Sequence, residues 1–180
     1  LHVVGVVVDL EDGGEGVDVV SYRFDELTLT TGVFFSAASV GGGGTQMLAD
    51  GLGGVDRLVD IERVVLTGSS FDDTLIGGSG SDQITGGAGN DQLVGNGGED
   101  LFIGDAGDDR LEGGDDWDIV AYISATSAIT VDLRRTDSQA VGGDMGSDLL
   151  LSIENVEGGA FNDTLTGDAG ENWLAGAAGD

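Results

Sequence analysis

An aspartate recurs at every ninth position in the middle of this chain, each time after a glycine-rich stretch. From Gly68 the chain divides without gaps into GSSFDDTLI, GGSGSDQIT, GGAGNDQLV, GNGGEDLFI, GDAGDDRLE and GGDDWDIVA, which end at Ala121. Position six of every block is aspartate, namely Asp73, Asp82, Asp91, Asp100, Asp109 and Asp118. Carboxylates repeated at a fixed interval indicate binding of a hard cation, which prefers oxygen ligands.

Glycine opens every block, at residues 68, 77, 86, 95, 104 and 113. Glycines in such a turn permit positive φ and a tight curve that aims backbone carbonyls at one point. Calcium takes about six to eight oxygen ligands, so one turn offers too few and two stacked turns offer enough. We therefore expect Ca²⁺ between successive coils; Mg²⁺ fits worse because it demands octahedral geometry and keeps its waters.

The period of nine also predicts the fold that positions these aspartates. Position eight is always apolar (Leu75, Ile84, Leu93, Phe102, Leu111 and Val120), as expected for a short strand whose middle side chain points into a core. A short fixed repeat is typical of a solenoid of stacked coils. Since no stretch shows a sustained helical apolar period, we expect an all-β fold with almost no helix.

Similar blocks recur at 13–21, 158–166 and 167–175, and longer stretches lie between the arrays. In 122–157, Ile129, Val131 and Leu133 alternate with polar neighbours, and so do Leu149, Leu151 and Ile153, which predicts half-buried strands. We expect four segments: a flanking β segment at 1–67 with one nonapeptide at 13–21, a core roll at 68–121, a longer-strand β segment at 122–157 and a second, truncated array at 158–180.

The charge of the chain limits the classes of molecule that it is expected to bind. The chain has 34 acidic residues against six arginines and no lysine, a net charge of −28 that disfavours nucleic acid and anionic membranes. It has no cysteine, which fits an extracellular protein stabilised by metal rather than by disulfides. No apolar run long enough for a transmembrane helix and no ordinary signal peptide are visible. Stacked carboxylates repel, so we expect folding to depend on calcium.

Catalysis is not expected. The single histidine is His2, and the chain has neither an HExxH nor a GxSxG motif, so zinc and nucleophilic chemistry lack their parts. Carboxylate pairs could serve a glycosidase, but their repeat spacing already explains them as metal ligands. Trp117 and Trp173 could contact a sugar, although packing or surface roles are favoured.

The blocks GGSGSDQIT and GGAGNDQLV resemble the GGxGxDxUx nonapeptide of RTX proteins, the haemolysin-type calcium-binding family of secreted bacterial proteins. The resemblance implies a right-handed parallel β-roll (β-solenoid) in which two nonapeptides form one coil, with Ca²⁺ between stacked turns. Asp73, Asp91 and Asp109 would then line one edge, and Asp82, Asp100 and Asp118 the other. About four ions are expected in 68–121 from the demand for oxygen ligands.

Turn glycines would complete the ligand shells through their carbonyls. The expected metal ligands are Asp73, Gly78, Gly80, Asp82, Gly87, Gly89, Asp91, Gly98, Asp100, Gly107, Asp109 and Asp118, with Asp18 and Asp163 in the flanking blocks. Ser69, Phe71 and Phe161 replace glycines, so their turns are expected to cap a roll and bind weakly. Asp116 and Asn172 also depart from the pattern.

The resemblance further implies a non-catalytic, calcium-responsive folding module of a larger bacterial protein, exported by type I secretion and joined to neighbouring domains. An alternative is a carbohydrate-binding or adhesive module on the same scaffold, contacting polysaccharide or cell-surface glycans, or a piece of a surface layer. Fold alone does not choose between these functions.

Overall fold

The computed structural model describes residues 19–23, 34–36, 45–49, 55–59 and 63–179, and within them all regular structure is β-strand. The strands are β1 (Val19–Arg23), β2 (Phe34–Ser36), β3 (Thr45–Ala49), β4 (Val55–Val59), β5 (Arg63–Thr67), β6 (Thr74–Ile76), β7 (Gln83–Ala88), β8 (Gln92–Gly97), β9 (Leu101–Ala106), β10 (Arg110–Asp115), β11 (Ile119–Ala121), β12 (Thr130–Asp132), β13 (Gln139–Ala140), β14 (Ser147–Leu151), β15 (Asn155–Glu157), β16 (Thr164–Thr166) and β17 (Trp173–Ala175). The expected all-β fold is confirmed for these residues.

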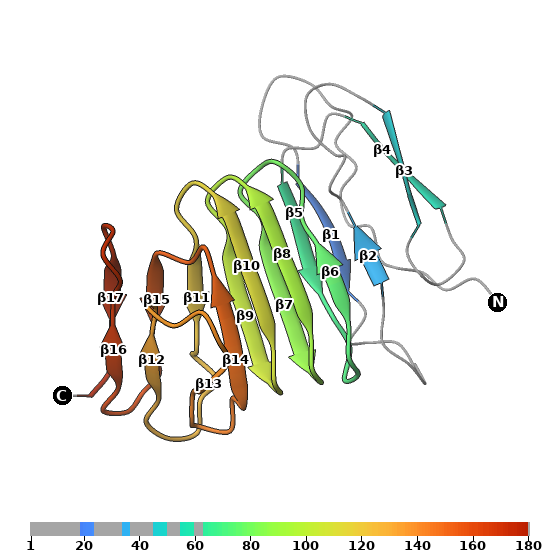
Figure 1. Ribbon diagram of the computed structural model, residues 1–180. Coiled ribbons are helices and arrows are strands. Elements are labelled where there is room, and N and C mark those ends of the chain that lie inside the picture. Colours follow the sequence, from blue (N-terminus) through green and yellow to red (C-terminus); the bar gives the residue numbers. More distant parts are fainter. Residues whose placement is uncertain (1–18, 24–33, 37–44, 50–54, 60–62, 180) are drawn as a thin grey trace.

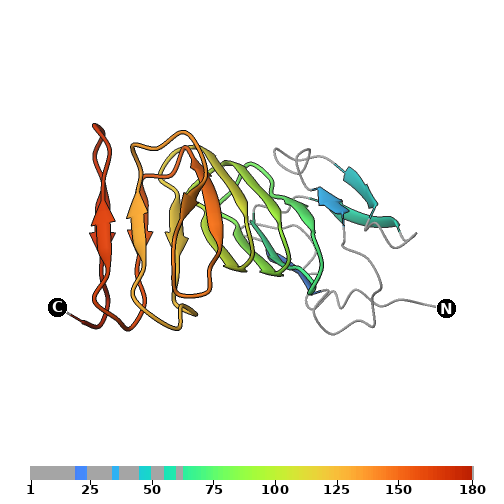
Figure 2. The ribbon, with the colours of Figure 1, turned by 60° about the horizontal axis from the view of Figure 1, so that its bottom comes forward.

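Two stacks of strands face each other across the solenoid (Figures 1 and 2). One has the order β1-β5-β7-β9-β11-β15-β17 and the other β13-β14-β10-β8-β6-β2. Within the nonapeptide array, neighbouring strands are parallel and residues eighteen apart lie opposite each other, such as Ile84 with Phe102 and Leu93 with Leu111. One coil therefore contains two nonapeptides, and the predicted parallel β-roll is confirmed.

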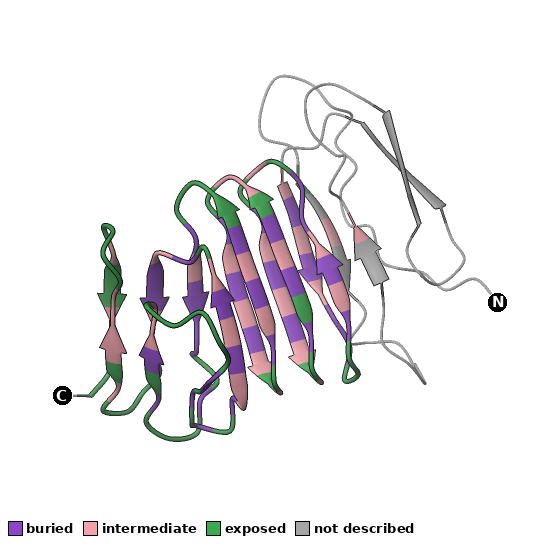
Figure 3. Cartoon of the chain, in the orientation of Figure 1, coloured by how far each residue is buried: buried purple, intermediate pink, exposed green. Residues whose placement is uncertain are grey.

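The core is a column of single side chains from each stack. All six position-eight residues, Leu75 to Val120, have no exposed surface. Their neighbours in the strand are half-buried or exposed, except in β11, where Ala121 is also buried (Figure 3). Alternation follows from the two-residue period of a strand, which sends successive side chains to opposite faces. The expected core positions are thus confirmed.

Residues 122–157 interrupt the parallel stack with an antiparallel insertion. β13 pairs antiparallel with β14, and an isolated antiparallel bridge joins Ile129 to Gly142 next to β12. β14 then stacks in parallel on β10, β15 stacks on β11, and β12 pairs in parallel with β16. The strands in this segment contain two to five residues, whereas β7 to β10 contain six each, so they are shorter than expected.

The alternation predicted in 122–157 is right in one strand and wrong in another. Ile129 and Val131 are buried as expected, but in β14 the buried residues are Asp148 and Leu150, while Leu149 and Leu151 are half-buried. The cause is the register with β10, which places Leu150 opposite the core residue Leu111. A one-residue error of phase exchanges the two faces of a strand.

No helix in the described ranges is long and apolar enough to cross a membrane.

The core column predicts a large difference between two phenylalanines. Phe102 is fully buried, whereas Phe161 is 39% exposed. In saturating calcium, Phe102→Ala should lower the free energy of unfolding by about 3–5 kcal/mol because it leaves a cavity. Phe161→Ala is the matched control and should cost less than about 1 kcal/mol. Urea titration followed by circular dichroism measures both, and equal losses would contradict this account of the core.

Candidate metal centre

The aspartates of position six form two ladders along the edges of the roll. The N–H of Asp73 donates to Asp91 Oδ1 (2.8 Å), and that of Asp91 donates to Asp109 Oδ1 (2.9 Å). On the other edge the same bonds run from Asp82 to Asp100 and from Asp100 to Asp118 (2.8 and 2.9 Å). The structure therefore has the predicted grouping of the six aspartates on two edges, and each is at most 2% exposed.

The second carboxylate oxygen divides the turns into two classes. In four turns, Oδ2 is buried and has no hydrogen-bond partner; these open turns are 86–91, 95–100, 104–109 and 113–118, ending in Asp91, Asp100, Asp109 and Asp118. In the closed turns, the carboxylate or amide oxygen accepts the N–H of position two. The bonds are Ser69 to Asp73 (2.5 Å), Gly78 to Asp82 (2.6 Å), Gly159 to Asp163 (2.9 Å) and Asp168 to Asn172 (2.9 Å).

Backbone conformation separates the same two classes. In the open turns, positions two and four have positive φ, as at Asn96 (81°) and Gly98 (95°). Asp116, which replaces a position-four glycine, also has a φ of 77°, so this departure keeps the open conformation. None of the residues at positions two and four of the closed turns has a positive φ. Glycine, asparagine and aspartate tolerate this left-handed region best, whereas Ser69 and Phe71 suit a closed turn.

The glycine at position one has a different role from the one expected. Its φ is not positive in any of the six blocks. A Cβ on Gly95 would instead collide with Asp100 Oδ2, and one on Gly113 would collide with Asp118 Oδ2. Position one is therefore glycine because the carboxylate of the same turn lies against its Cα, not because the backbone needs the left-handed region.

Burial makes the open turns electrostatically unfavourable. It raises the pKa of Asp100 to about 8 and that of Asp91, Asp109 and Asp118 to about 7; backbone hydrogen bonds oppose the rise, and neighbouring carboxylates add to it. The ion pairs among the described residues, such as Arg134–Asp132 and Arg135–Asp137, lie at the surface and do not neutralise these groups. Unpaired buried charges cost several kcal/mol each, so the open turns require a cation or protons.

The donor set of the open turns fits Ca²⁺. Nowhere in the described part of the chain do three His, Cys, Asp or Glu side chains gather into a metal cluster, so a site here must combine a carboxylate with main-chain oxygens. Calcium accepts such mixed shells. The residues that would hold it are Asp91, Asp100, Asp109 and Asp118, together with turn carbonyls such as those of Gly87, Gly89, Gly98 and Gly107. The bound ion would supply the positive charge that the turns lack.

The remaining predicted ligands are placed differently. Asp73, Gly78, Gly80, Asp82 and Asp163 belong to closed turns, where main-chain N–H groups already satisfy the acidic oxygen, and their role as ligands stays a prediction. Asp18 lies outside the described residues.

Two acidic residues that the sequence analysis missed extend the ladders. Asp109 N–H donates to Asp148 Oδ1 (3.0 Å), and Asp118 N–H donates to Glu154 Oε2 (3.0 Å). Burial raises the pKa of Asp148 to about 6, while hydrogen bonds from Asp109 N–H and the Tyr122 hydroxyl oppose the rise. The sequence does contain a signal for Asp148, the further nonapeptide GDMGSDLLL at 143–151. This block is out of phase with the array, because steps of nine from Gly113 reach residue 140 rather than Gly143.

Comparison with known families agrees with this geometry. The model of the RTX calcium-binding nonapeptide repeat (4 copies) matches residues 67–102, 94–122 and 152–180. Residues 67–122 and 152–180 belong to the RTX calcium-binding repeat family. All four open turns of this RTX protein lie within 67–122, whereas the repeat at 143–151 lies between the matched segments. No curated protein matches the chain.

The raised pKa values predict a pH dependence without metal. A carboxyl group whose pKa is higher folded than unfolded binds protons more tightly in the folded state, so stability is present at low pH and falls as pH rises. The window runs from about pH 4, the ordinary value of aspartate, to about pH 8. In a calcium chelator, circular dichroism should therefore show the β-rich fold at pH 4.5 and its progressive loss as the pH rises to 8.5.

The Asp100→Asn variant is the control for that pH dependence. It removes one titrating group, so the loss of stability with pH should flatten by up to about 1.4 kcal/mol per pH unit. Metal-free stability that rises with pH over this window would contradict the assignment.

Proposed function

We propose that this RTX chain is a calcium-dependent folding module, non-catalytic itself, of a larger secreted bacterial protein. The family makes it a calcium-binding repeat module of a type found in secreted bacterial proteins. The observation that carries the finer proposal is the set of four buried carboxylate oxygens without a partner, one in each open turn. Each marks a place where the fold lacks a positive charge, which gives four ions as the expected number in 68–121.

Calcium and folding are coupled because the same carboxylates serve both. Each open-turn aspartate holds the coil before it through Oδ1 and leaves Oδ2 for a cation. Without metal, the coils bring buried negative charges into register, so ion binding contributes directly to folding free energy. In low cytosolic calcium the chain would stay unfolded, which suits type I secretion, and millimolar external calcium would fold it.

We propose that the chain has four segments, 1–67, 68–121, 122–157 and 158–180. Among the described residues, all four turns whose Oδ2 lacks a partner lie in the second segment. The role of such a module is to fold after export and to hold neighbouring domains.

Calcium titration of the whole chain tests this function. With the metal-free chain, circular dichroism should gain a β-rich spectrum as calcium is added, and equilibrium dialysis should count four bound ions. Asp100→Asn should remove one ion and shift the folding midpoint to higher calcium. Asp137→Asn is the matched control, since Asp137 pairs with Arg135 at the surface and is 75% exposed. A β-rich spectrum that persists in excess chelator at pH 8.5, where the aspartates are ionised, would refute the proposal.

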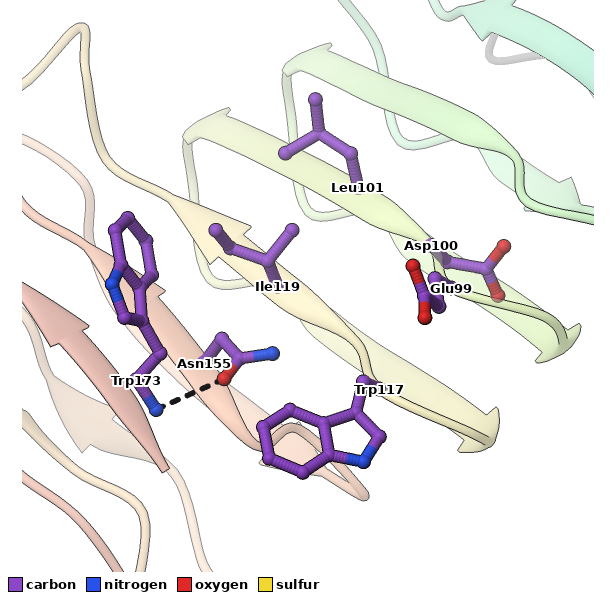
Figure 4. A pocket seen from close by; sticks show the side chains of 7 residues that line it. All are labelled: Glu99, Asp100, Leu101, Trp117, Ile119, Asn155 and Trp173. Atoms are coloured by element: carbon purple, nitrogen blue, oxygen red, sulfur yellow. Dashed lines mark hydrogen bonds between the residues drawn. The ribbon is translucent and has the colours of Figure 1, made fainter. Parts of the chain in front are cut away.

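One observation favours glycan binding as a second function. Trp117 and Trp173 are 45% and 51% exposed and line one groove of about 370 Å³ on the outer face of the β9-β11-β15-β17 stack (Figure 4). Asn155 lies between the two indoles, and its Oδ1 accepts a hydrogen bond from the backbone N–H of Trp173 (3.0 Å). Exposed indoles present flat apolar faces with a polar N–H, which suits the stacking of a sugar ring.

The charge of the groove selects among glycans. Glu99 and Asp100 also line it, so neutral polysaccharides are favoured over polyanions such as alginate. Calorimetry in saturating calcium should give heat with a neutral glycan, lost in Trp117→Ala and Trp173→Ala at unchanged calcium stoichiometry. Absence of heat with every glycan, or heat unaffected by both substitutions, would exclude this groove as a glycan site.

A further inference from the structure

The repeat at 143–151 has the backbone of an open turn. Asp144 and Gly146, at positions two and four, have φ values of 68° and 78°, as in the four turns with orphaned carboxylates. Asp148, at position six, is fully buried and accepts Asp109 N–H (3.0 Å), which makes it the next layer of the Asp73–Asp91–Asp109 ladder. At positions two, four and six, 143–148 thus matches the open turns, although Gly143 at position one has a positive φ (62°), unlike position one of the six array blocks.

The Oδ2 of Asp148 is nevertheless not orphaned. It accepts the hydroxyl of Tyr122 (2.8 Å), which is 1% exposed and follows β11 in the opposite stack. The Tyr122 backbone is fixed by its own N–H, which donates to Glu157 O (2.9 Å), and by its carbonyl, which accepts Ala125 N–H (3.1 Å). The ring therefore reaches across the core from a fixed anchor to the turn.

The Oδ2 of position six has one of three environments along the roll. In closed turns it accepts the N–H of position two, and in the four open turns no group of the described chain donates to it. At 143–148 the positive φ of Asp144 accompanies the loss of that N–H bond, as in the open turns, and a side chain distant in sequence takes its place. The hydroxyl leaves the carboxylate charged but satisfies its second oxygen, and it is present whenever the core is packed.

We propose that the Tyr122 hydroxyl occupies the cation position of the turn 143–148, so that this layer forms without calcium and ends the Asp73–Asp91–Asp109 ladder. The inference rests on calcium binding by the four open turns. It makes 143–148 a latent calcium site, which removal of the hydroxyl exposes. The layer would then be a fixed template on which the calcium-dependent coils stack.

Counting bound ions in matched variants of the whole chain tests the inference. Equilibrium dialysis with ⁴⁵Ca²⁺ should show one ion fewer in Asp109→Asn and no change in Asp148→Asn. Tyr122→Phe and Tyr122→Leu remove the hydroxyl, the second with more space, and at least one should bind one ion more than the wild type. Adding Asp148→Asn to that variant should abolish the extra ion.

The outcomes separate this inference from the function on which it rests. Loss of one ion in Asp148→Asn alone would make Asp148 an ordinary ligand and overturn the inference, as would the absence of an extra ion in both Tyr122 variants. If the wild type itself binds no calcium, the proposed function fails. If Asp109→Asn loses an ion but the Tyr122 variants gain none, only the inference fails.

Discussion

Buried carboxylates without a counter-charge are the constraint on which this roll depends. At both edges of the roll, a buried aspartate accepts a main-chain hydrogen bond from the neighbouring coil through its Oδ1. In four of these aspartates, the Oδ2 has no hydrogen-bond partner in the described chain. Within 68–121 each nonapeptide contributes one large buried hydrophobic side chain, too few to offset several unpaired charges. We propose that a divalent cation bound by each open turn resolves the conflict, which would make the fold responsive to calcium.

The closed turns and the turn 143–148 lie on either side of the four open turns along the chain. At 68–82 and 158–172 the acidic or amide oxygen folds back on the N–H of position two, and at 143–148 a tyrosine hydroxyl takes over. The side chains at position five form a further hydrogen-bonded ladder, apart from the proposed calcium sites. The N–H of Asn90 donates to Asp72 Oδ1, and the N–H of Asp108 donates to Asn90 Oδ1. The register between coils is therefore set by main-chain and side-chain hydrogen bonds. The proposed cation would balance the charge of the open turns.

The repeat period predicted stacked coils and the core column from residue types, whereas the coil of two nonapeptides and the two aspartate edges followed from the resemblance to RTX nonapeptides. The sequence could not predict which turns are open. Blocks 77–85 and 86–94 both fit the consensus, yet the turn 77–82 is closed and the turn 86–91 is open. The difference follows the position of each turn in the stack. Asp148 was missed because its block is out of phase, and the Tyr122 bond because it joins residues 26 apart through the core.

Locating the ions is the most direct test of this account. Crystals of the calcium-loaded chain, measured at a long wavelength where calcium scatters anomalously, should show one anomalous peak beside Oδ2 in each of the four open turns and none at the Tyr122–Asp148 contact. A map with those four carboxylates buried as described and no anomalous density beside them would contradict the claim that cations hold the coils together.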